Sequence, residues 1–119
     1  MIPFSDPSAS YHAHKSEIDQ AIKRVLDSGW YVLGSEVDGF EKEFASFHGK
    51  DLHAIGVANG TDAIALCLRG IGLGIGDEVI TPSHTAVATV AGIEQAGCTP
   101  VFADIDPKTR CITPKSIDE

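Results

Sequence analysis

The chain has 119 residues, of which 43% are hydrophobic and 22% are charged, and its formal net charge is -8. The nine lysine and arginine residues are scattered without forming a run, so a nucleic-acid-binding surface is not expected. No apolar run approaches the ~18 residues of a membrane-spanning helix, and the N-terminus lacks the basic start and apolar stretch of a signal peptide. We therefore expect a cytoplasmic protein.

Residues 1–50 are predicted to form an irregular segment followed by two helices. Pro3 and Pro7 fall in the first 14 residues and are expected to keep that segment irregular. Apolar residues then recur at helical spacing, which predicts two helices, over 16–28 and 35–48. Each is followed by a glycine as a stop signal, Gly29 and Gly49.

From residue 51 onwards, short apolar strands alternate with helices. Three strands are predicted, over 53–58, 77–82 and 99–105. Two helices are predicted between them, over 61–73 and 85–96. The second is apolar nearly all round and is expected to be buried. Strands joined by crossover helices form a parallel sheet, so the predicted class is α/β.

The last residues have the pattern of an unfinished helix. Ser116 is the expected N-cap, and only one turn follows it. We therefore expect the chain to be the front part of a larger protein.

Asn59, Gly60, Thr61 and Asp62 lie between a predicted strand and a predicted helix. Ligands of parallel sheets collect at the carboxyl ends of the strands. A helix N-terminus there offers unpaired N–H groups and a positive dipole end, which together hold phosphate. Gly60 would let the backbone approach closely, and Thr61 could add a hydroxyl donor. Two interpretations stay open: a phosphate site, or Asn59 or Thr61 acting only as a helix cap.

A second loop, 81–86, follows the next predicted strand at the same sheet edge and carries His84. A loop histidine is commonly solvated surface. Beside a phosphate site, however, its flat ring could stack on a flat cofactor. Ser83 or Thr85 is the expected cap of the helix that follows.

Three other patterns predict no site. The glycine-rich segment 70–76 lacks the spacing of a dinucleotide-binding loop. His12 and His14 have no third ligand in reach by sequence, so no metal site is expected. Asp104 and Asp106 resemble a carboxylate pair, but Asp106 with Pro107 more simply forms a turn.

Three segments, taken together, resemble a known family: SGWYVLGSEVDGFEKEFASFHG, VANGTDAIALCLRGIGLGIGDEVITPSHTAVATV and GCTPVFADIDPKT. They resemble the DegT/DnrJ family of sugar aminotransferases, which are fold-type-I enzymes that use pyridoxal 5'-phosphate (PLP). The resemblance covers nearly the whole chain and keeps the family's order and spacing. It implies the N-terminal portion of the fold-type-I large domain, with residues 51–119 as the incomplete start of the PLP-binding α/β part. In the family's sheet, later strands separate the first strand from the second and third.

The resemblance also implies roles for individual residues. Gly60, Thr61 and Asp62 would bind the PLP phosphate, and His84 would stack on the pyridine ring. Tyr31, on the link between the first two helices, would touch the substrate or, like Trp30, serve packing alone.

The family's Schiff-base lysine, and the aspartate that pairs with the pyridine nitrogen, lie further downstream in relatives. No catalytic residue is therefore expected in this chain. Lys50, in the run SFHGK, has the wrong spacing for the Schiff-base lysine and precedes the phosphate loop.

The implied activity of the complete protein is transfer of an amino group, usually from glutamate, to a nucleotide-linked keto-sugar, by a homodimer. Two alternatives stay open. A PLP-binding relative that dehydrates sugars would have histidine in place of the Schiff-base lysine. A small flavodoxin-like phosphate-binding module would be complete as it stands, and the unfinished helix at the C-terminus counts against it.

Overall fold

The structure, a computed structural model, describes residues 3–118. The chain divides into two compact units, Met1–Gly56 (unit 1) and Val57–Glu119 (unit 2). Among the described residues, no helix is both long and apolar enough to cross a membrane.

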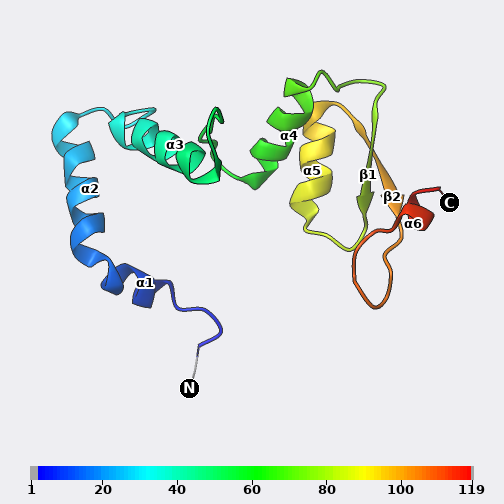
Figure 1. Ribbon diagram of the computed structural model, residues 1–119, viewed down its shortest axis with the longest axis horizontal. Coiled ribbons are helices and arrows are strands. Elements are labelled where there is room, and N and C mark those ends of the chain that lie inside the picture. The colour runs from blue at the N-terminus through cyan, green and yellow to red at the C-terminus, as the bar shows by residue number, and fades with distance from the viewer. Residues whose placement is uncertain (1–2, 119) are drawn as a thin grey trace. The chain divides into compact units, whose positions relative to one another are not determined.

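Over residues 3–56, unit 1 contains three helices, α1 (Pro7–Ala13), α2 (Lys15–Ser28) and α3 (Ser35–His48) (Figure 1). The helices predicted over 16–28 and 35–48 are confirmed, the first to within one residue and the second without change. Gly29 ends α2 in the left-handed conformation, with φ 66°, which a glycine adopts without a steric penalty.

An ion pair joins α2 to the first turn of α3. Arg24 Nε lies 2.6 Å from Glu36 Oε1, and Arg24 Nη2 lies 3.0 Å from Glu36 Oε2. Two parallel bonds of this kind fix the guanidinium against the carboxylate. The hydrogen bonds from Arg24 lower the pKa of Glu36 below its ordinary value.

The prediction that the first residues are irregular is wrong for Pro7–Ala13, which form α1. Asp6 is the N-cap of this helix, and its Oδ1 accepts a hydrogen bond from the Ala9 N–H at 3.1 Å. Pro7 occupies the first turn, where the missing N–H of proline breaks no helical bond and its fixed φ suits the helix. The proline therefore starts a helix here.

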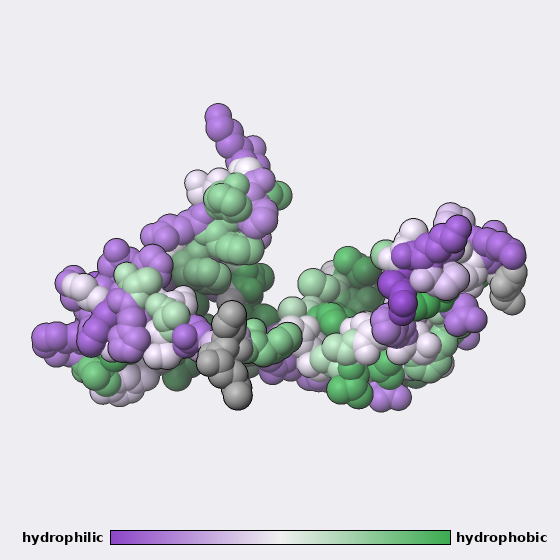
Figure 2. All heavy atoms as spheres, turned by 90° about the horizontal axis from the view of Figure 1, so that it is seen from below, coloured by the Kyte–Doolittle hydropathy of each residue, from purple (hydrophilic) through white to green (hydrophobic). Residues whose placement is uncertain are grey.

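Unit 1 has no apolar core among its described residues, because none of its helices contains a buried residue. Figure 2 shows hydrophobic residues at the surface of both units. Those in unit 1 include Leu26 on α2 and three phenylalanines of α3, Phe40, Phe44 and Phe47.

In its described residues, 57–118, unit 2 contains two parallel strands and three helices. In chain order they are α4 (Gly60–Gly70), β1 (Glu78–Pro82), α5 (Val87–Ala96), β2 (Thr99–Ala103) and α6 (Pro114–Asp118). The strands pair in parallel, from Glu78 opposite Thr99 to Pro82 opposite Ala103. The α/β class and two of the three predicted strands are thereby confirmed, although β2 ends two residues earlier than predicted.

The strand predicted over 53–58 is wrong, because no residue of that range is in a strand. A strand exists only when its backbone pairs with a neighbour, and the sheet described here contains only β1 and β2. The backbone N–H of Gly56 donates instead to Glu41 Oε1 of α3, at 2.6 Å. An apolar run can thus have the composition of a strand and still form none, because no neighbouring backbone pairs with it.

The core of unit 2 lies where α4 and α5 pack side by side (Figure 1). Four buried residues form it, namely Ala65, Ile93, Ala96 and Cys98. The expectation that α5 is buried holds for one face only, because Val87 in its first turn is 84% exposed. The core is therefore small, and Ile93 is its largest fully buried side chain.

The C-terminal helix α6 begins at Pro114, so the prediction that Ser116 is its N-cap is wrong. Thr113 Oγ1 accepts from the Ser116 N–H at 3.2 Å, and Ser116 Oγ accepts from the Thr113 N–H at 3.0 Å. This reciprocal pair is a capping box that starts at Thr113. The predicted helix included Glu119, which lies outside the described residues.

Asp106 forms the predicted turn. Its Oδ1 accepts hydrogen bonds from the Lys108 and Thr109 N–H groups, at 2.9 Å and 2.8 Å. These two backbone donors lower the pKa of Asp106 below its ordinary value, because they stabilise the charged carboxylate.

Candidate functional site

Asn59 is the N-cap of α4. Its Oδ1 accepts a hydrogen bond from the Asp62 N–H at 2.9 Å, and its backbone carbonyl accepts from the Ala63 N–H at 3.1 Å. Of the two caps that the sequence allowed, the structure therefore selects Asn59. This cap uses the third N–H of the helix and leaves the first two free.

The backbone N–H groups of Gly60 and Thr61 have no acceptor among the described residues. Both belong to the first turn, where an α-helix leaves its N–H groups without an internal partner. A Cβ built on Gly60 would meet no atom within 4 Å, so the space beside the turn is open. Two unpaired donors at the positive end of a helix, beside open space, fit a phosphate group.

Asp62 occupies a different position from the two residues before it. Its N–H is already bound by Asn59. Its Oδ2 accepts from Asn59 Nδ2 at 2.9 Å, and its Oδ1 accepts from Gln95 Nε2 of α5 at 3.3 Å. In this structure Asp62 thus holds the turn together, and it offers an incoming anion no free backbone donor.

His84 is exposed on the segment between β1 and α5. Figure 1 shows that α4 and α5 both begin at the end of unit 2 toward which β1 runs. The structure therefore brings His84 and the Gly60–Asp62 turn to the same end of the unit, although no strand precedes that turn among the described residues.

The helix that follows His84 has no side-chain cap. It begins at Val87 with Ala86 as N-cap, and no side chain caps it. The expectation that Ser83 or Thr85 caps this helix is therefore wrong. Thr85 Oγ1 lies 3.0 Å from Thr89 Oγ1 instead.

Tyr31 lies in unit 1, on the link between α2 and α3, whereas the other four predicted site residues lie in unit 2. Its side chain is 65% exposed, and that of Trp30 is 62% exposed. Neither ring is therefore a buried packing residue in the part of the chain that the structure describes.

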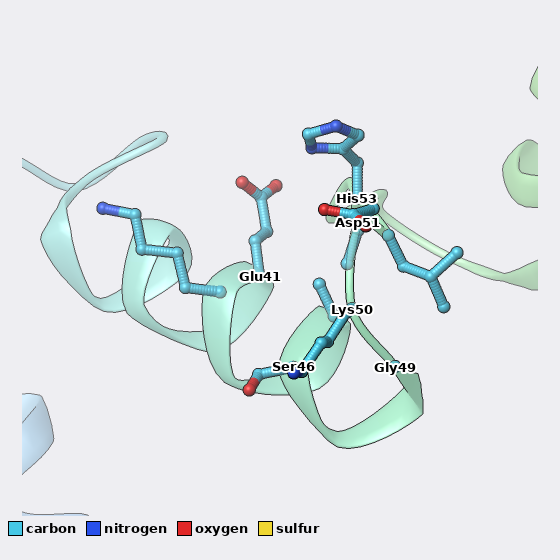
Figure 3. A pocket seen from close by; sticks show the side chains of 10 residues that line it. Glu41, Ser46, Gly49, Lys50, Asp51 and His53 are labelled. Atoms are coloured by element: carbon cyan, nitrogen blue, oxygen red, sulfur yellow. The ribbon is translucent and has the colours of Figure 1, made fainter.

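A hollow in unit 1 is lined by α3 and the segment that follows it (Figure 3). Its walls include Glu41, Lys50 and His53. Glu41 is already engaged, since it accepts the Gly56 N–H. Lys50, the lysine of the run SFHGK, lies in this unit and Gly60 lies in the other.

Sequence reasoning missed Gln95 and Arg69, which support the turn from outside the loop. Gln95 Nε2 donates to Asp62, and the Gln95 carbonyl accepts from Arg69 Nη2. These partners are 33 and 26 residues apart in the chain, so no local spacing signals them. They become visible only once α4 and α5 are packed together.

Comparison with known proteins decides the family. The model of the DegT/DnrJ/EryC1/StrS aminotransferase family matches residues 12–119. The chain belongs to this family. The resemblance noted in the sequence is thereby confirmed. The structure has the fold of solved proteins that it resembles, which include an aminotransferase of this family from Brucella abortus.

Among curated members of the DegT/DnrJ/EryC1/StrS family, a dTDP-3-amino-3,6-dideoxy-alpha-D-galactopyranose transaminase from Aneurinibacillus thermoaerophilus is 49% identical over 100% of this chain and 32% of its own length. The chain thus spans about a third of the length of that relative.

Solved structures with similar sequences have the same fold. DesV from S. venezuelae, solved in complex with a ketimine intermediate, is 46% identical, with a TM-score of 0.90 over 98% of this chain and 31% of its own. NtdA from Bacillus subtilis, solved with bound cofactor PMP, is 34% identical, with a TM-score of 0.80 over 89% of this chain and 24% of its own.

Proposed function

We propose that this chain supplies the phosphate-binding turn of a PLP-dependent aminotransferase that acts on a nucleotide-linked keto-sugar. One observation carries the proposal: the N–H groups of Gly60 and Thr61 are unpaired at the N-terminus of α4, beside open space. Membership of the family supports PLP as the source of that phosphate. The printed names of relatives, which include dTDP-sugar transaminases and a UDP-sugar aminotransferase, support the substrate class.

In this proposal each part of the turn has its own task. The N–H groups of Gly60 and Thr61, with the Thr61 hydroxyl, donate to the phosphate oxygens. Gly60 has no side chain between its N–H and the ligand. Asn59 and Asp62 keep the turn in the shape that presents these donors. Residues 51–119 would then be the start of the cofactor-binding α/β part of the enzyme.

His84 would cover one face of the cofactor ring. It is exposed at the same end of unit 2 as the turn, and an imidazole ring can stack on a pyridine ring. Tyr31 would contact the substrate from unit 1. When bound, PLP supplies the electron sink that transamination requires, and the protein supplies binding, orientation and the exclusion of water.

The longer enzyme would provide what this chain does not. The lysine that binds the cofactor covalently, and the aspartate opposite the pyridine nitrogen, would come from other parts of the complete protein. Glutamate is the proposed amino donor. A homodimer in the cytoplasm is the proposed state of that enzyme.

The first experiment measures how the complete protein that carries this chain binds PLP and pyridoxal, which lacks the phosphate. Gly60→Val places a Cβ in open space beside the two free N–H groups, so it should leave the fold intact and lower the affinity for PLP. Loss of one charge-assisted hydrogen bond is worth ~1.5–3 kcal/mol, or roughly 10- to 100-fold in affinity. The affinity for pyridoxal should stay unchanged.

Gly70→Val is the matched control. Gly70 ends the same helix, and a Cβ there also meets no atom within 4 Å. It should leave both affinities unchanged. A Gly60→Val protein that binds PLP as tightly as the parent would contradict the assignment of the phosphate to this turn.

A further inference from the structure

The first turn of α4 rests on one face of α5, at Gly92. A Cβ built on Gly92 would lie 2.9 Å from the Thr61 carbonyl oxygen and 2.9 Å from Ile64 Cβ, closer than real Cβ atoms approach. Thr61 provides one of the two unpaired N–H groups. The absence of a side chain at Gly92 therefore lets the backbone of the turn approach α5 this closely.

Gln95, one helical turn after Gly92, contacts α4 at two points. Its side-chain amide donates to Asp62 Oδ1 at 3.3 Å, and its backbone carbonyl accepts from Arg69 Nη2. Asp62 and Arg69 are seven residues apart, about two turns of an α-helix. A residue that holds α4 at two levels limits both its rotation and its slide against α5.

The contact from Gln95 also restrains a negative charge beside the proposed phosphate. Asp62 follows Thr61 directly, and a free carboxylate there would repel an anion or compete for the unpaired N–H groups. One carboxylate oxygen is bound by Gln95 Nε2 and the other by Asn59 Nδ2. Hydrogen bonds from two amide groups thus stabilise the negative charge of Asp62 and hold its carboxylate in place.

We propose that Gln95 is a positioning residue for the phosphate-binding turn, and that the absence of a side chain at Gly92 lets this turn pack closely against α5. The inference rests on the proposed function, because it assigns α5 a role in binding the phosphate of that cofactor. Gln95 does not touch the ligand in this proposal. It acts through Asp62.

The test compares Gln95→Leu and Gln95→Glu in the complete protein, with PLP and pyridoxal as probes. Both variants remove the amide donor and keep the backbone carbonyl that binds Arg69. Since a net hydrogen bond is worth ~0.5–1.5 kcal/mol, the ratio of PLP affinity to pyridoxal affinity should fall about 3- to 10-fold in Gln95→Leu. It should fall further in Gln95→Glu, because the new carboxylate repels Asp62. A loss of general stability would weaken both probes alike and leave the ratio unchanged.

Two control variants match these substitutions. Gln20 makes an exposed side-chain hydrogen bond within α2, to Ser16 Oγ at 3.1 Å, so Gln20→Leu should not change the ratio. Gly92→Ala should lower the ratio more strongly than Gln95→Leu, whereas Gly39→Ala within α3, where a Cβ meets no atom within 4 Å, should have no effect. Gln95 is exposed, so its variants test the proposal even if Gly92→Ala fails to fold.

Each outcome has a separate meaning. A ratio that falls in the order parent, Gln95→Leu, Gln95→Glu supports the inference. A parent that prefers PLP over pyridoxal, together with unchanged ratios in both Gln95 variants, overturns the inference and leaves the proposed function standing. A parent that binds both probes equally contradicts the proposed function, and the inference with it.

Discussion

Asn59 offers a way to separate the shape of the α4 turn from its charge. Asn59→Ala removes the oxygen that accepts the Asp62 N–H at 2.9 Å and the amide that donates to Asp62 Oδ2 at 2.9 Å. Loss of an N-cap costs ~1 kcal/mol in the free energy of unfolding. Asn59→Asp keeps a good cap acceptor, because aspartate and asparagine are similar N-caps, but it places a second carboxylate beside that of Asp62.

The two substitutions should therefore have different effects. Two like charges ~4 Å apart repel by about 1 kcal/mol where water screens them well, and an incoming phosphate meets the same added charge. Asn59→Ala should lower the free energy of unfolding by ~1 kcal/mol and weaken PLP binding moderately. Asn59→Asp keeps the cap acceptor but repels Asp62, so it should lower the free energy of unfolding by a similar ~1 kcal/mol. It should weaken PLP binding more than Asn59→Ala does, by roughly a further fivefold, since ~1.4 kcal/mol is a factor of ten.

The assay for this prediction combines denaturant unfolding with PLP and pyridoxal titrations of the complete protein. Asp6→Ala is the matched control, because Asp6 caps α1 in unit 1 in the same way. It should leave the ratio of PLP to pyridoxal affinity unchanged. If Asn59→Asp binds PLP as tightly as the parent while Asn59→Ala does not, only the cap matters, and our reasoning about charge beside the phosphate is wrong.

Three further predictions concern the core, an ion pair and the histidine. Ile93→Ala should lower the free energy of unfolding by ~2–5 kcal/mol, because Ile93 is 1% exposed. Ile75→Ala should lower it little, because Ile75 is 97% exposed. Equal denaturation midpoints for the two variants would refute the assigned core. Because Arg24 lowers the pKa of Glu36 in the folded state, their pair should stabilise the fold above the unfolded pKa of Glu36, ~4.3, and lose this effect as the pH falls through the lower folded value. The difference in melting temperature between the parent and Glu36→Gln should thus shrink in acid, and a difference independent of pH would contradict it. His84→Ala should weaken PLP binding by ~0.5–1.5 kcal/mol and shift the cofactor's absorbance maximum, and His84→Phe should restore the affinity. If neither the affinity nor the absorbance maximum changes in His84→Ala, His84 is not part of the site.

Helices with explicit stop signals were predictable from the sequence. The ends of α2 and α3 were predicted from Gly29 and Gly49, and both glycines follow the observed helices. Capping residues and helical spacing act within a few positions of one another, so a single sequence contains them.

Two errors at helix starts have one cause. From the sequence, an irregular segment is expected at Pro7, and α6 is expected to start after Pro114 and not at it. In the structure each proline begins its helix, after Asp6 in one case and Thr113 in the other. A proline directly after a capping residue is favoured at a first helical position. The sequence therefore contains the signal for both helix starts, in a capping residue followed directly by proline.

Other features depend on contacts that no local pattern contains. The run 53–58 has the composition of a strand but no neighbour to pair with in the part of the chain that the structure describes. The support of the α4 turn by Gln95 depends on the packing of two helices. The start of α4 was predictable, because Asn59 and Gly60 are adjacent to the helical pattern in the sequence, although no strand precedes them among the described residues.

The most direct test of the central claim is an experimental structure of the complete protein with PLP bound. We expect the cofactor's phosphate within hydrogen-bond distance of the Gly60 and Thr61 N–H groups, with the Asp62 carboxylate still held by Gln95. A phosphate bound elsewhere, with these two N–H groups facing solvent, would contradict the account.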